Sequence, residues 1–434
     1  MAQLDKPHVL LTGGTGFLGK VILQELVRRR QLGDFPPHKI TLLIRDSKKL
    51  DSKSRFAKLT QSRCFSKLES GWSDSIDFIN GELKSKGCGL NPDVYAESCQ
   101  KVTHIIHCAA SVDFNLPLAD AAASNIDTCL NILEFAENCP NLQKIVLVST
   151  AYVTPHRPGK VQEQLAALPA PAEELLLAAK SDRTDEKALL KSCGHPNTYT
   201  LTKSIAEHLA ARYSGNLPLT IVRPSIISAA WQYPFPGWLD SRGALGGYAA
   251  LFGAGFLHVM EGSVDTTFDI VPVDIVADHV IENLCLVRDQ KSSKAEQENV
   301  HIVHSVAGLR HGSPAKSMIS VGLEYFGRNV VFQPPYWKYM GVRSPKYYWY
   351  RFTSQTFPLS LARLYYDLTR NERKQKQVRM VMQGIEKVNQ CFPYFCLHTY
   401  DFATTQRIPD NFSMEAYLDV ICIGVHKHLL LGNV

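Results

Sequence analysis

Short apolar runs alternate with longer amphipathic stretches over most of the chain. A short apolar run bounded by glycine, proline or polar residues predicts a buried strand, whereas apolar positions that recur about every 3.6 residues predict a helix. The runs that predict strands are residues 9–11, 39–44, 76–79, 102–108, 144–148, 219–222, 268–271 and 300–304. The main segments that predict helices are residues 20–30, 118–139 and 198–213. This alternation favours an α/β fold of the Rossmann type, with a doubly wound parallel sheet.

Two segments depart from this alternation. Residues 155–195 are rich in Pro, Ala, Leu and Glu, and they predict a helical excursion from the sheet. Further on, aromatic side chains crowd residues 332–357, and a strongly basic stretch and a helical tail follow. We therefore expect a sheet-bearing domain at residues 1–310 and a smaller, mostly helical domain at residues 311–434.

The composition is that of an ordinary globular protein, with 45% hydrophobic and 20% charged residues among 434. The net charge of +6 suits an anionic ligand but is too small to indicate nucleic acid as a partner. No apolar run has the length of a transmembrane span, and the first residues do not resemble a signal peptide. Eleven cysteines without any Cys-x-x-Cys spacing are typical of reduced thiols. We therefore expect an intracellular protein, either cytoplasmic or peripheral to an organelle membrane.

Two histidine pairs have a spacing like that of metal ligands, namely His104 with His107 and His301 with His304. Both pairs fall in predicted strands, where residues three apart point to opposite faces of the sheet. We therefore expect no metal site.

The turn between the first strand and the first helix is rich in glycine: Thr12-Gly-Gly-Thr-Gly-Phe-Leu-Gly19. In such a turn Gly13 permits the tight bend, Gly16 lets backbone N–H groups approach a pyrophosphate, and Gly19 lets the helix pack close to the strand. The N-terminus of the helix adds positive potential. A plain glycine-rich turn is the alternative, but the position between a strand and a helix favours dinucleotide binding. The expected cofactor contacts are Thr12, Gly13, Thr15, Gly16, Phe17, Leu18 and Gly19.

The ends of the following strands add further candidates. Arg45 ends the second strand, where NAD-binding folds place a carboxylate and where a basic residue accommodates the 2′-phosphate of NADP. Basic side chains are also common on surface loops, so NAD stays the alternative, but Arg45 favours NADP(H). The other candidates are Glu82 and Leu83, in a turn that we expect near the adenine, and Ala109 and Ala110 after the fourth strand.

The sharpest chemical signal is Tyr199-Thr-Leu-Thr-Lys203 on a predicted helix. Residues four apart share a helix face, so the phenol and the ammonium project to the same side. A neighbouring ammonium favours the phenolate, so we expect Lys203 to lower the pKa of Tyr199. A tyrosine of this kind can protonate a carbonyl oxygen while hydride reaches the carbon. An ordinary helix face is the alternative, but the glycine turn and the strand-end hydroxyls of Ser149 and Thr150 favour a catalytic pair.

These motifs resemble the extended short-chain dehydrogenase/reductases, and within them the fatty acyl-CoA reductases of the male sterility type. The resemblance covers roughly residues 8–285, and residues 394–430 more faintly resemble that family's small C-terminal helical domain. Besides the glycine turn, it rests on His107-Cys-Ala-Ala-Ser-Val-Asp-Phe114, Val148-Ser-Thr-Ala-Tyr-Val153, Asn197-Thr-Tyr-Thr-Leu-Thr-Lys203, Ile221-Val-Arg-Pro-Ser-Ile226, Pro234-Phe-Pro-Gly-Trp238 and Asp269-Ile-Val-Pro-Val-Asp274.

The resemblance implies a role for each matching residue. Tyr199 is expected to donate the proton, and Lys203 also to hold the nicotinamide ribose. Thr150 is expected to form a hydrogen bond with the carbonyl oxygen. Ser149 is the second choice for this role, and it is otherwise expected to contact the cofactor. The expected neighbours of the nicotinamide are Arg223, Pro224 and Ser225, and Ile226 is a further expected cofactor contact.

Two departures from the family pattern concern the cofactor site. Glu82 stands where the family usually has Asp, which changes the expected contacts to the adenine. Asp127-Thr128-Cys129 replaces a small, glycine-bearing stretch after Asn125, and this leaves the local helix packing open.

The implied activity is NADPH-dependent reduction of a long-chain fatty acyl-CoA to the aldehyde or the primary fatty alcohol, the alcohol being favoured. Hydride addition to a thioester creates an oxyanion that hydroxyl groups can stabilise, and a thiolate whose conjugate acid has a pKa of about 8.5 is a tolerable leaving group. The alternatives are reduction of a carrier-bound polyketide or acyl thioester, reduction of another carbonyl substrate, and a non-catalytic NADP-binding scaffold.

The aromatic residues between Phe332 and Phe357 allow three interpretations. They fill the core of the second domain, they supply an acyl-binding surface, or they form a patch for peripheral membrane association. The basic residues 370–379 are most often typical of a solvated helix face, although contact with CoA phosphates or anionic lipid is an alternative.

Overall fold

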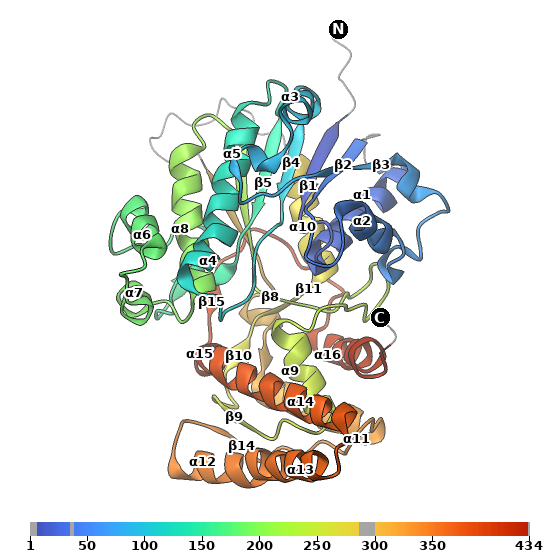
Figure 1. The fold of residues 1–434 in the computed structure, drawn as a ribbon, viewed down its shortest axis with the longest axis vertical. Helices are drawn as coiled ribbons and strands as arrows, with labels where there is room; N and C mark the ends of the chain where they lie inside the picture. Colours follow the sequence, from blue (N-terminus) through green and yellow to red (C-terminus); the bar gives the residue numbers. More distant parts are fainter. Residues whose placement is uncertain (1–6, 35–38, 286–299, 433–434) are drawn as a thin grey trace.

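The computed structural model describes residues 7–34, 39–285 and 300–432, and its framework is a seven-stranded parallel sheet (Figure 1). The strands follow the order β12-β7-β5-β4-β1-β2-β3, so the chain begins in the middle and winds outward in both directions. The predicted doubly wound sheet is confirmed. Its strands are β1 (His8–Thr12), β2 (Lys39–Ile44), β3 (Ile76–Asn80), β4 (His104–His107), β5 (Lys144–Val148), β7 (Leu219–Pro224) and β12 (His301–Ser305).

Side chains that alternate along the strands divide the core into two layers. Val9 and Leu11 of β1 face the layer that contains α1 (Phe17–Leu32) and α10 (Val273–Cys285). Leu10, between them, faces the layer with α5 (Thr128–Glu137) and α8 (Thr198–Tyr213). All three side chains are fully buried. Because helices cover both faces, the strands are continuous apolar runs, as is typical of parallel sheets.

The remaining helices flank this sheet or lie beyond it. In the front of the chain they are α2 (Ser52–Thr60), α3 (Pro92–Lys101), α4 (Leu118–Ala122), α6 (Ala172–Lys180), α7 (Glu186–Cys193) and α9 (Ala244–Gly253). Toward the C-terminus they are α11 (Ala315–Arg328), α12 (Pro345–Arg351), α13 (Phe357–Leu368), α14 (Glu372–Cys391), α15 (Pro393–Leu397) and α16 (Met414–Gly424).

The smaller, mostly helical region lies at one end of the sheet, below it in Figure 1. Two of the short pairings that join it to earlier parts of the chain are parallel. Strand β14 (Tyr339–Gly341) runs parallel to β9 (Val259–Glu261), and β15 (Asp401–Phe402) runs parallel to β6 (Lys160–Val161). Helix α9 packs against α11 and α14, so part of the chain before residue 310 lies among the C-terminal helices. The domain boundary near residue 310 stays a prediction.

Two expected elements differ in detail from the structure. The predicted helix at 118–139 consists of α4, a π-helical turn at Ala123–Asp127, and α5. The predicted strand at 268–271 lies outside the main sheet, because β10 (Thr267–Phe268) pairs with β13 (Ser313–Pro314) and β11 (Ile270–Pro272) pairs with β8 (Ile226–Ser228). These two-stranded sheets connect the main sheet to the helical region.

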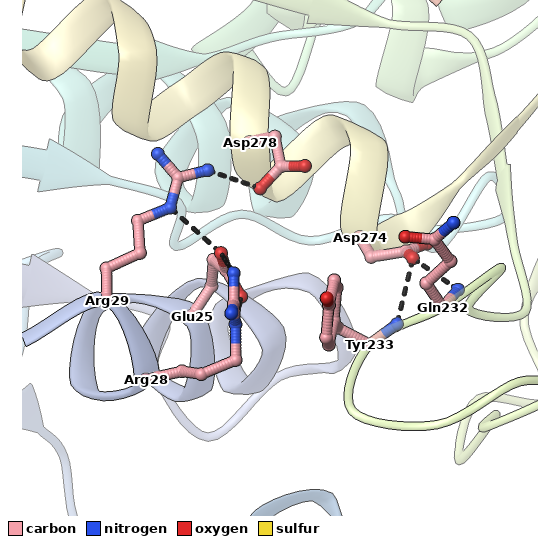
Figure 2. Close-up of polar contacts among 7 residues, drawn as sticks. All are labelled: Glu25, Arg28, Arg29, Gln232, Tyr233, Asp274 and Asp278. Carbon is pink, nitrogen blue, oxygen red and sulfur yellow. Dashed lines mark hydrogen bonds and ion pairs between the residues drawn. The ribbon is translucent and has the colours of Figure 1, made fainter. Parts of the chain in front are cut away.

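Helices α1 and α10 pack side by side and share a network of charges, which Figure 2 shows. Glu25 accepts hydrogen bonds from Arg28 and Arg29, and Arg29 also donates to Asp278 of α10 at 2.6 Å. Burial works to raise the pKa of Glu25, but the bonds from the two arginines lower it. At Asp278, burial and then the Glu25 carboxylate raise the pKa to about 7 against the effect of Arg29. The Arg29 guanidinium therefore bonds to two carboxylates, and the charged form of Asp278 is less stabilised than that of Glu25.

The same helix pair also holds the loop that follows β8. Buried Asp274 of α10 accepts hydrogen bonds from the backbone N–H groups of Trp231, Gln232 and Tyr233, and Figure 2 draws the bonds from Gln232 and Tyr233. The Arg28 guanidinium lies 4.1 Å from the centre of the Tyr233 ring, a cation–π contact. The loop is thereby fixed against α1, the helix that follows the glycine turn.

We expect the substitution Asp278→Asn to change how stability depends on pH. Because folding raises this pKa, the carboxyl group contributes most stability when protonated, and this contribution is lost as the pH rises through about 7. The neutral amide avoids that loss. Between about pH 5 and about pH 8, the melting temperature of the variant should rise relative to that of the wild type. Asp265→Asn, at a 74% exposed side chain, is the control, and a constant difference between Asp278→Asn and wild type would contradict the expectation.

Candidate active site

The glycine turn after β1 leaves no room for side chains at two positions. Gly13 has a left-handed backbone (φ +75°), and a Cβ atom there would lie 2.7 Å from the backbone nitrogen of Ala109. A Cβ atom at Gly19 would lie 2.2 Å from the carbonyl oxygen of Gly13. Thr12 is fully buried, and its hydroxyl contacts the Nδ1 atom of His107 at 2.9 Å. The ends of β1 and β4 and the start of α1 are thus held in close contact.

The start of α1 fits the phosphates of a dinucleotide. Gly16 caps the helix with an extended backbone, is exposed, and has no side chain that bonds the free N–H groups. Those N–H groups are therefore available to an anion. Leu18 is buried, and the Phe17 ring stacks on Trp238 at 5.3 Å between ring centres. Half-buried Thr15 accepts a hydrogen bond from Arg55 at 2.9 Å.

Two arginines gather beside this turn at the end of β2. Arg55 donates to the backbone oxygen of Arg45 as well as to Thr15, and Arg45 lies 3.5 Å from the Glu82 carboxylate. The Arg45 side chain is 56% exposed, so it can reach a ligand. The nearest acid in sequence, Asp46, instead accepts bonds from the Ser52 N–H and the Asn80 amide. The structure therefore presents cations here, and the neighbouring carboxylate is already bonded to protein groups.

The other strand-end residues lie along the same edge of the sheet. Leu83, which follows β3, is buried. After β4, Ala109 is half-buried and Ala110 is exposed. Burial and then Lys203 lower the pKa of nearby His107 to about 3, so this ring is neutral at physiological pH. This edge, formed by the carboxyl ends of parallel strands, is where ligands bind in doubly wound folds.

Tyr199, Lys203 and Thr150 meet at the end of β5. Asn197 caps α8 by accepting a hydrogen bond from the Thr200 N–H at 2.9 Å, and this starts the helix just before Tyr199. The Lys203 ammonium, one turn later, donates to the backbone oxygen of Val148 at 2.8 Å. Thr150 is close enough to Tyr199 for a hydrogen bond between their side chains. The three predicted catalytic residues are thus together, and Lys203 is anchored to the sheet.

The electrostatics of this group differ from the expectation. Burial raises the pKa of Tyr199 to about 12, against the hydrogen bond with Thr150, which lowers it. Burial also lowers the pKa of Lys203. The prediction that the lysine lowers the tyrosine pKa is therefore wrong, because burial has the larger effect. Tyr199 holds its proton at neutral pH, so it is a potential donor.

A small cavity lies beside Lys203. Its volume is about 20 Å³, and its lining includes Asn125, Ser149, Glu207 and Lys203. The Ser149 hydroxyl is buried without a hydrogen-bond partner among the described residues. Asn125, in the π-helical turn, accepts from the Ser111 N–H at 2.9 Å and donates to Thr202 at 3.0 Å. Through these two bonds, the π-helical turn connects the loop after β4 to α8.

The segment after β7 is more enclosed than the resemblance implied. Pro224 and Ser225 are buried and Ile226 is half-buried. Ser225 donates to Asp269 at 2.6 Å. Arg223 is fully buried and pairs with Glu207, so its side chain serves the core rather than the open edge.

A cluster of aromatic rings beside Tyr199 was missed by sequence reasoning. Phe114 stacks on Tyr199 with ring centres 5.5 Å apart, and Phe395 of α15 lies 5.9 Å from Phe114. Tyr152 contacts Phe395 edge-on at 5.0 Å. The ion pair between Asp113 and Lys387 of α14, at 3.0 Å, joins the same two regions. Phe114 lies within a recognised motif, but nothing local in the sequence marks Phe395, because it reaches the site only through tertiary packing.

Other parts of the molecule fit the chemistry less well. A groove of about 340 Å³ between α5, α6 and α8 includes Glu134, Glu137 and Glu173 in its lining, which disfavours an anionic ligand. Helix α12, which carries exposed Trp349 and is followed by exposed Phe352, lies at the end of the helical region away from the sheet (Figure 1). Within the described ranges, no cluster of three or more His, Cys, Asp or Glu is placed to hold a metal. Across the same ranges, no helix has the length and apolar character needed to span a bilayer.

Comparison with known proteins gives consistent family and fold matches. The family model described as "Male sterility protein" matches residues 11–280. Fatty acyl-CoA reductase 1 of Gallus gallus is 32% identical over 308 residues, which are 69% of this chain and 58% of that protein. Fatty acyl-CoA reductase 2 of Mus musculus is 26% identical over 457 residues, which are 99% and 86% of the two chains. The matched part thus spans less than two thirds of the chicken protein.

Among solved structures, the terminal R domain from the myxalamid PKS-NRPS biosynthetic pathway superimposes with a TM-score of 0.65 at 19% identity, covering 98% of this chain and 92% of that one. The reductase (R) domain of the nonribosomal peptide synthetase from Mycobacterium tuberculosis gives a TM-score of 0.61 at 17% identity, covering 99% and 93%. At such identities the likeness concerns the fold. It extends through the C-terminal helices as well as the sheet.

We expect Gly19→Ala to destabilise the protein and to weaken dinucleotide binding, because the added methyl group meets backbone atoms that cannot move aside. The free energy of unfolding should fall by about 1–3 kcal/mol, measured by denaturant titration. The control is Gly327→Ala in α11, where a Cβ atom would meet nothing within 4 Å, so stability should stay equal or rise. Equal stability of the Gly19 variant and wild type would contradict the close packing.

Proposed function

The chain belongs to the male sterility family of fatty acyl-CoA reductases, within the extended short-chain dehydrogenase/reductases, and we propose that it reduces a long-chain fatty acyl-CoA with NADPH. Membership in this family makes it a nicotinamide-dependent oxidoreductase. The observation that carries the proposal is the meeting of Tyr199, Thr150 and Lys203 at a strand end, beside the ring of Phe114.

The cofactor is assigned to the edge of the sheet formed by the glycine turn. The open N–H groups in the first turn of α1, just after Gly16, suit the pyrophosphate, and the close packing at Gly13 and Gly19 brings the backbone near it. Arg45 and Arg55 are proposed to hold the 2′-phosphate, because guanidinium groups bind phosphate oxygens in pairs. Their placement beside Thr15 supports NADPH over NADH.

The remaining cofactor contacts are proposals of the same kind. Lys203 is suited to the nicotinamide ribose, since its ammonium lies at the end of β5. Further contacts are assigned to Thr12, Thr15, Phe17, Leu18, Glu82, Leu83, Ala109, Ala110, Ser149, Pro224, Ser225 and Ile226. Because Thr12 and Leu83 are buried, their contribution is to the shape of the site.

When bound, the nicotinamide supplies the hydride. Thr150 and Tyr199 are proposed to donate hydrogen bonds to the thioester carbonyl oxygen and so to stabilise the oxyanion that develops there. The raised pKa keeps Tyr199 protonated at neutral pH, so it retains the proton that it gives to this oxygen. The oxygen then returns this proton to Tyr199 while the carbon–sulfur bond breaks, which releases CoA as a thiolate and leaves the aldehyde. The same hydroxyl groups suit a second reduction, to the primary alcohol.

A covalent route through cysteine is not favoured. Burial raises the pKa of Cys108 to about 11 and that of Cys129 to about 12, although Lys203 works to lower both. Both thiols are therefore neutral at physiological pH, and a neutral thiol is a poor nucleophile. All eleven cysteines are free, which supports the proposal of a reducing, intracellular environment.

The acyl group is proposed to lie against the aromatic rings beside Tyr199. The Phe114 ring stacks on the phenol, and Phe395, from a separate region of the chain, packs against Phe114. An apolar wall of this kind favours a fatty substrate over a sugar nucleotide. The solved reductase domains of similar fold make a carrier-bound thioester the second candidate, since the likeness covers 98% of this chain.

The decisive experiment incubates the purified protein with NADPH and palmitoyl-CoA and identifies the products by mass spectrometry. We expect fatty aldehyde or alcohol from the wild type. Tyr199→Phe should retain NADPH affinity but lose activity by about 10²–10⁴-fold, because it lacks only the donated proton. Tyr213→Phe, an exposed tyrosine on the same helix, is the matched control and should keep full activity.

Two results would contradict this assignment. If the Tyr199 variant keeps more than half of the activity, another group donates the proton. If the wild type reduces only a carrier-bound thioester, or binds NADPH without turning over any carbonyl substrate, the acyl-CoA proposal fails.

We expect Arg45→Ala to reduce the preference for NADPH over NADH, measured as the ratio of the two kcat/KM values. One charge-assisted contact to phosphate corresponds to about a 10- to 100-fold change in that ratio. The double variant Arg45→Ala, Arg55→Ala should reduce it further. Lys53→Ala, an exposed lysine on α2, is the control. An unchanged ratio in the double variant would assign cofactor choice to other residues.

A further inference from the structure

Helix α13 exposes a continuous stripe of apolar side chains. Phe357, Leu361, Leu364 and Leu368 recur at intervals of four, three and four residues, so they share one face. Their exposed fractions run from 47% to 75%, and no residue of α13 is buried. The opposite face carries Leu359, which packs against the core. The stripe is therefore the outer face of an amphipathic helix.

A π-helical turn extends this stripe onto α12. The segment Phe352–Thr356 joins the two helices and adds one residue to the helical turn, which shifts the phase of the residues before it. The Phe352 ring consequently lies 5.6 Å from the Phe357 ring, on the outer face. Trp349, one turn earlier, is 64% exposed. The result is a ridge of 24 residues, about 36 Å long.

The ridge lies at the extreme end of the molecule, on the side away from the sheet (Figure 1). Helix α14 packs behind α13, whereas α12 contacts β9 and β14. No described element covers the outer face of α13. A flat surface can therefore approach the whole ridge at once.

The positive charge of the chain is concentrated around this ridge. Residues 338–380 carry ten Lys and Arg against two Asp and Glu, whereas the rest of the chain carries 37 against 39. Among the described residues, Arg370, Arg373, Lys374 and Lys376 form no ion pair. These four follow directly after α13, in the turn and at the start of α14, and all are exposed.

We propose that the α12–α13 ridge docks in the plane of an anionic lipid bilayer. An apolar face of Leu and aromatic side chains beside exposed lysine and arginine matches a helix that lies in the headgroup region of a membrane. A second copy of the chain is the weaker occupant, because a symmetric contact would bring the two basic clusters together. The inference does not depend on the proposed function, since it uses no residue of the candidate active site.

The test is flotation of the full chain with phosphatidylcholine vesicles, with and without phosphatidylserine. We expect strong binding only to the vesicles that contain phosphatidylserine. Leu364→Ser with Leu368→Ser should lower the partition coefficient by tenfold or more, because two exposed apolar side chains are lost. Lys374→Ala with Lys376→Ala should lower it about 25-fold on anionic vesicles, at about fivefold for each lysine.

Matched variants elsewhere separate this effect from a general loss of solubility or charge. Leu177→Ser changes a 71% exposed leucine on α6, and Lys187→Ala with Lys191→Ala removes two exposed lysines of α7. These variants should bind like the wild type. Fluorescence of the wild type should shift to the blue on binding, and Trp349→Phe should remove most of that shift. Reduction of a soluble acyl-CoA should be unchanged in the ridge variants, so a failure of docking is distinguishable from a failure of the proposed activity.

Three outcomes would overturn the proposal. One is the absence of binding to either kind of vesicle, or equal binding to both. Another is wild-type binding by both ridge variants. The third is a dimer in light scattering that the leucine variant breaks apart, since the ridge would then contact a second copy of the chain.

Discussion

The close approach of α1 to the ends of β1 and β4 is the constraint on which the rest of the site depends. At Gly13 and Gly19, backbone atoms of neighbouring segments occupy the space that a Cβ atom would need. Because the helix starts so near the sheet, its unbonded N–H groups open onto the carboxyl edge of the strands. The neighbouring elements then secure this helix, through the guanidinium of Arg29 toward α10 and the ring of Trp238 toward Phe17. A shift of α1 would therefore move the phosphate-binding edge relative to β5 and α8.

Burial decides the electrostatics along this edge. Tyr199, His107 and Cys108 are all held in their neutral forms, since burial is the largest influence on each pKa. The neutral phenol keeps its proton, and the neutral imidazole can act as a bonded partner for Thr12. Lys203 stays anchored to a strand carbonyl in the same surroundings. A site built in this way holds its proton donor ready at physiological pH.

The C-terminal helical region differs between the side that contacts the candidate active site and the side that faces outward. The inner face supplies Phe395 to the rings beside Tyr199 and Lys387 to the loop that carries Asp113. The outer face, on α12 and α13, carries exposed leucine and aromatic side chains instead. The aromatic crowding of this region therefore has no single role: some rings fill the core, as Tyr347 does, while Trp349 faces outward.

The sequence by itself determined the sheet, the glycine turn and the tyrosine–lysine pair, because each of these depends on local spacing. Short apolar runs and apolar positions with a period of 3.6 predict strands and helices directly, and residues four apart on α8 share a face wherever that helix lies. Only the tertiary structure decided the pKa of Tyr199, since burial depends on distant chain segments. The same holds for Phe395, which reaches the site across almost two hundred intervening residues after Tyr199. Arg223 is the converse case: it belongs to a recognised motif, but its pairing with Glu207 in the core turns it away from the open edge.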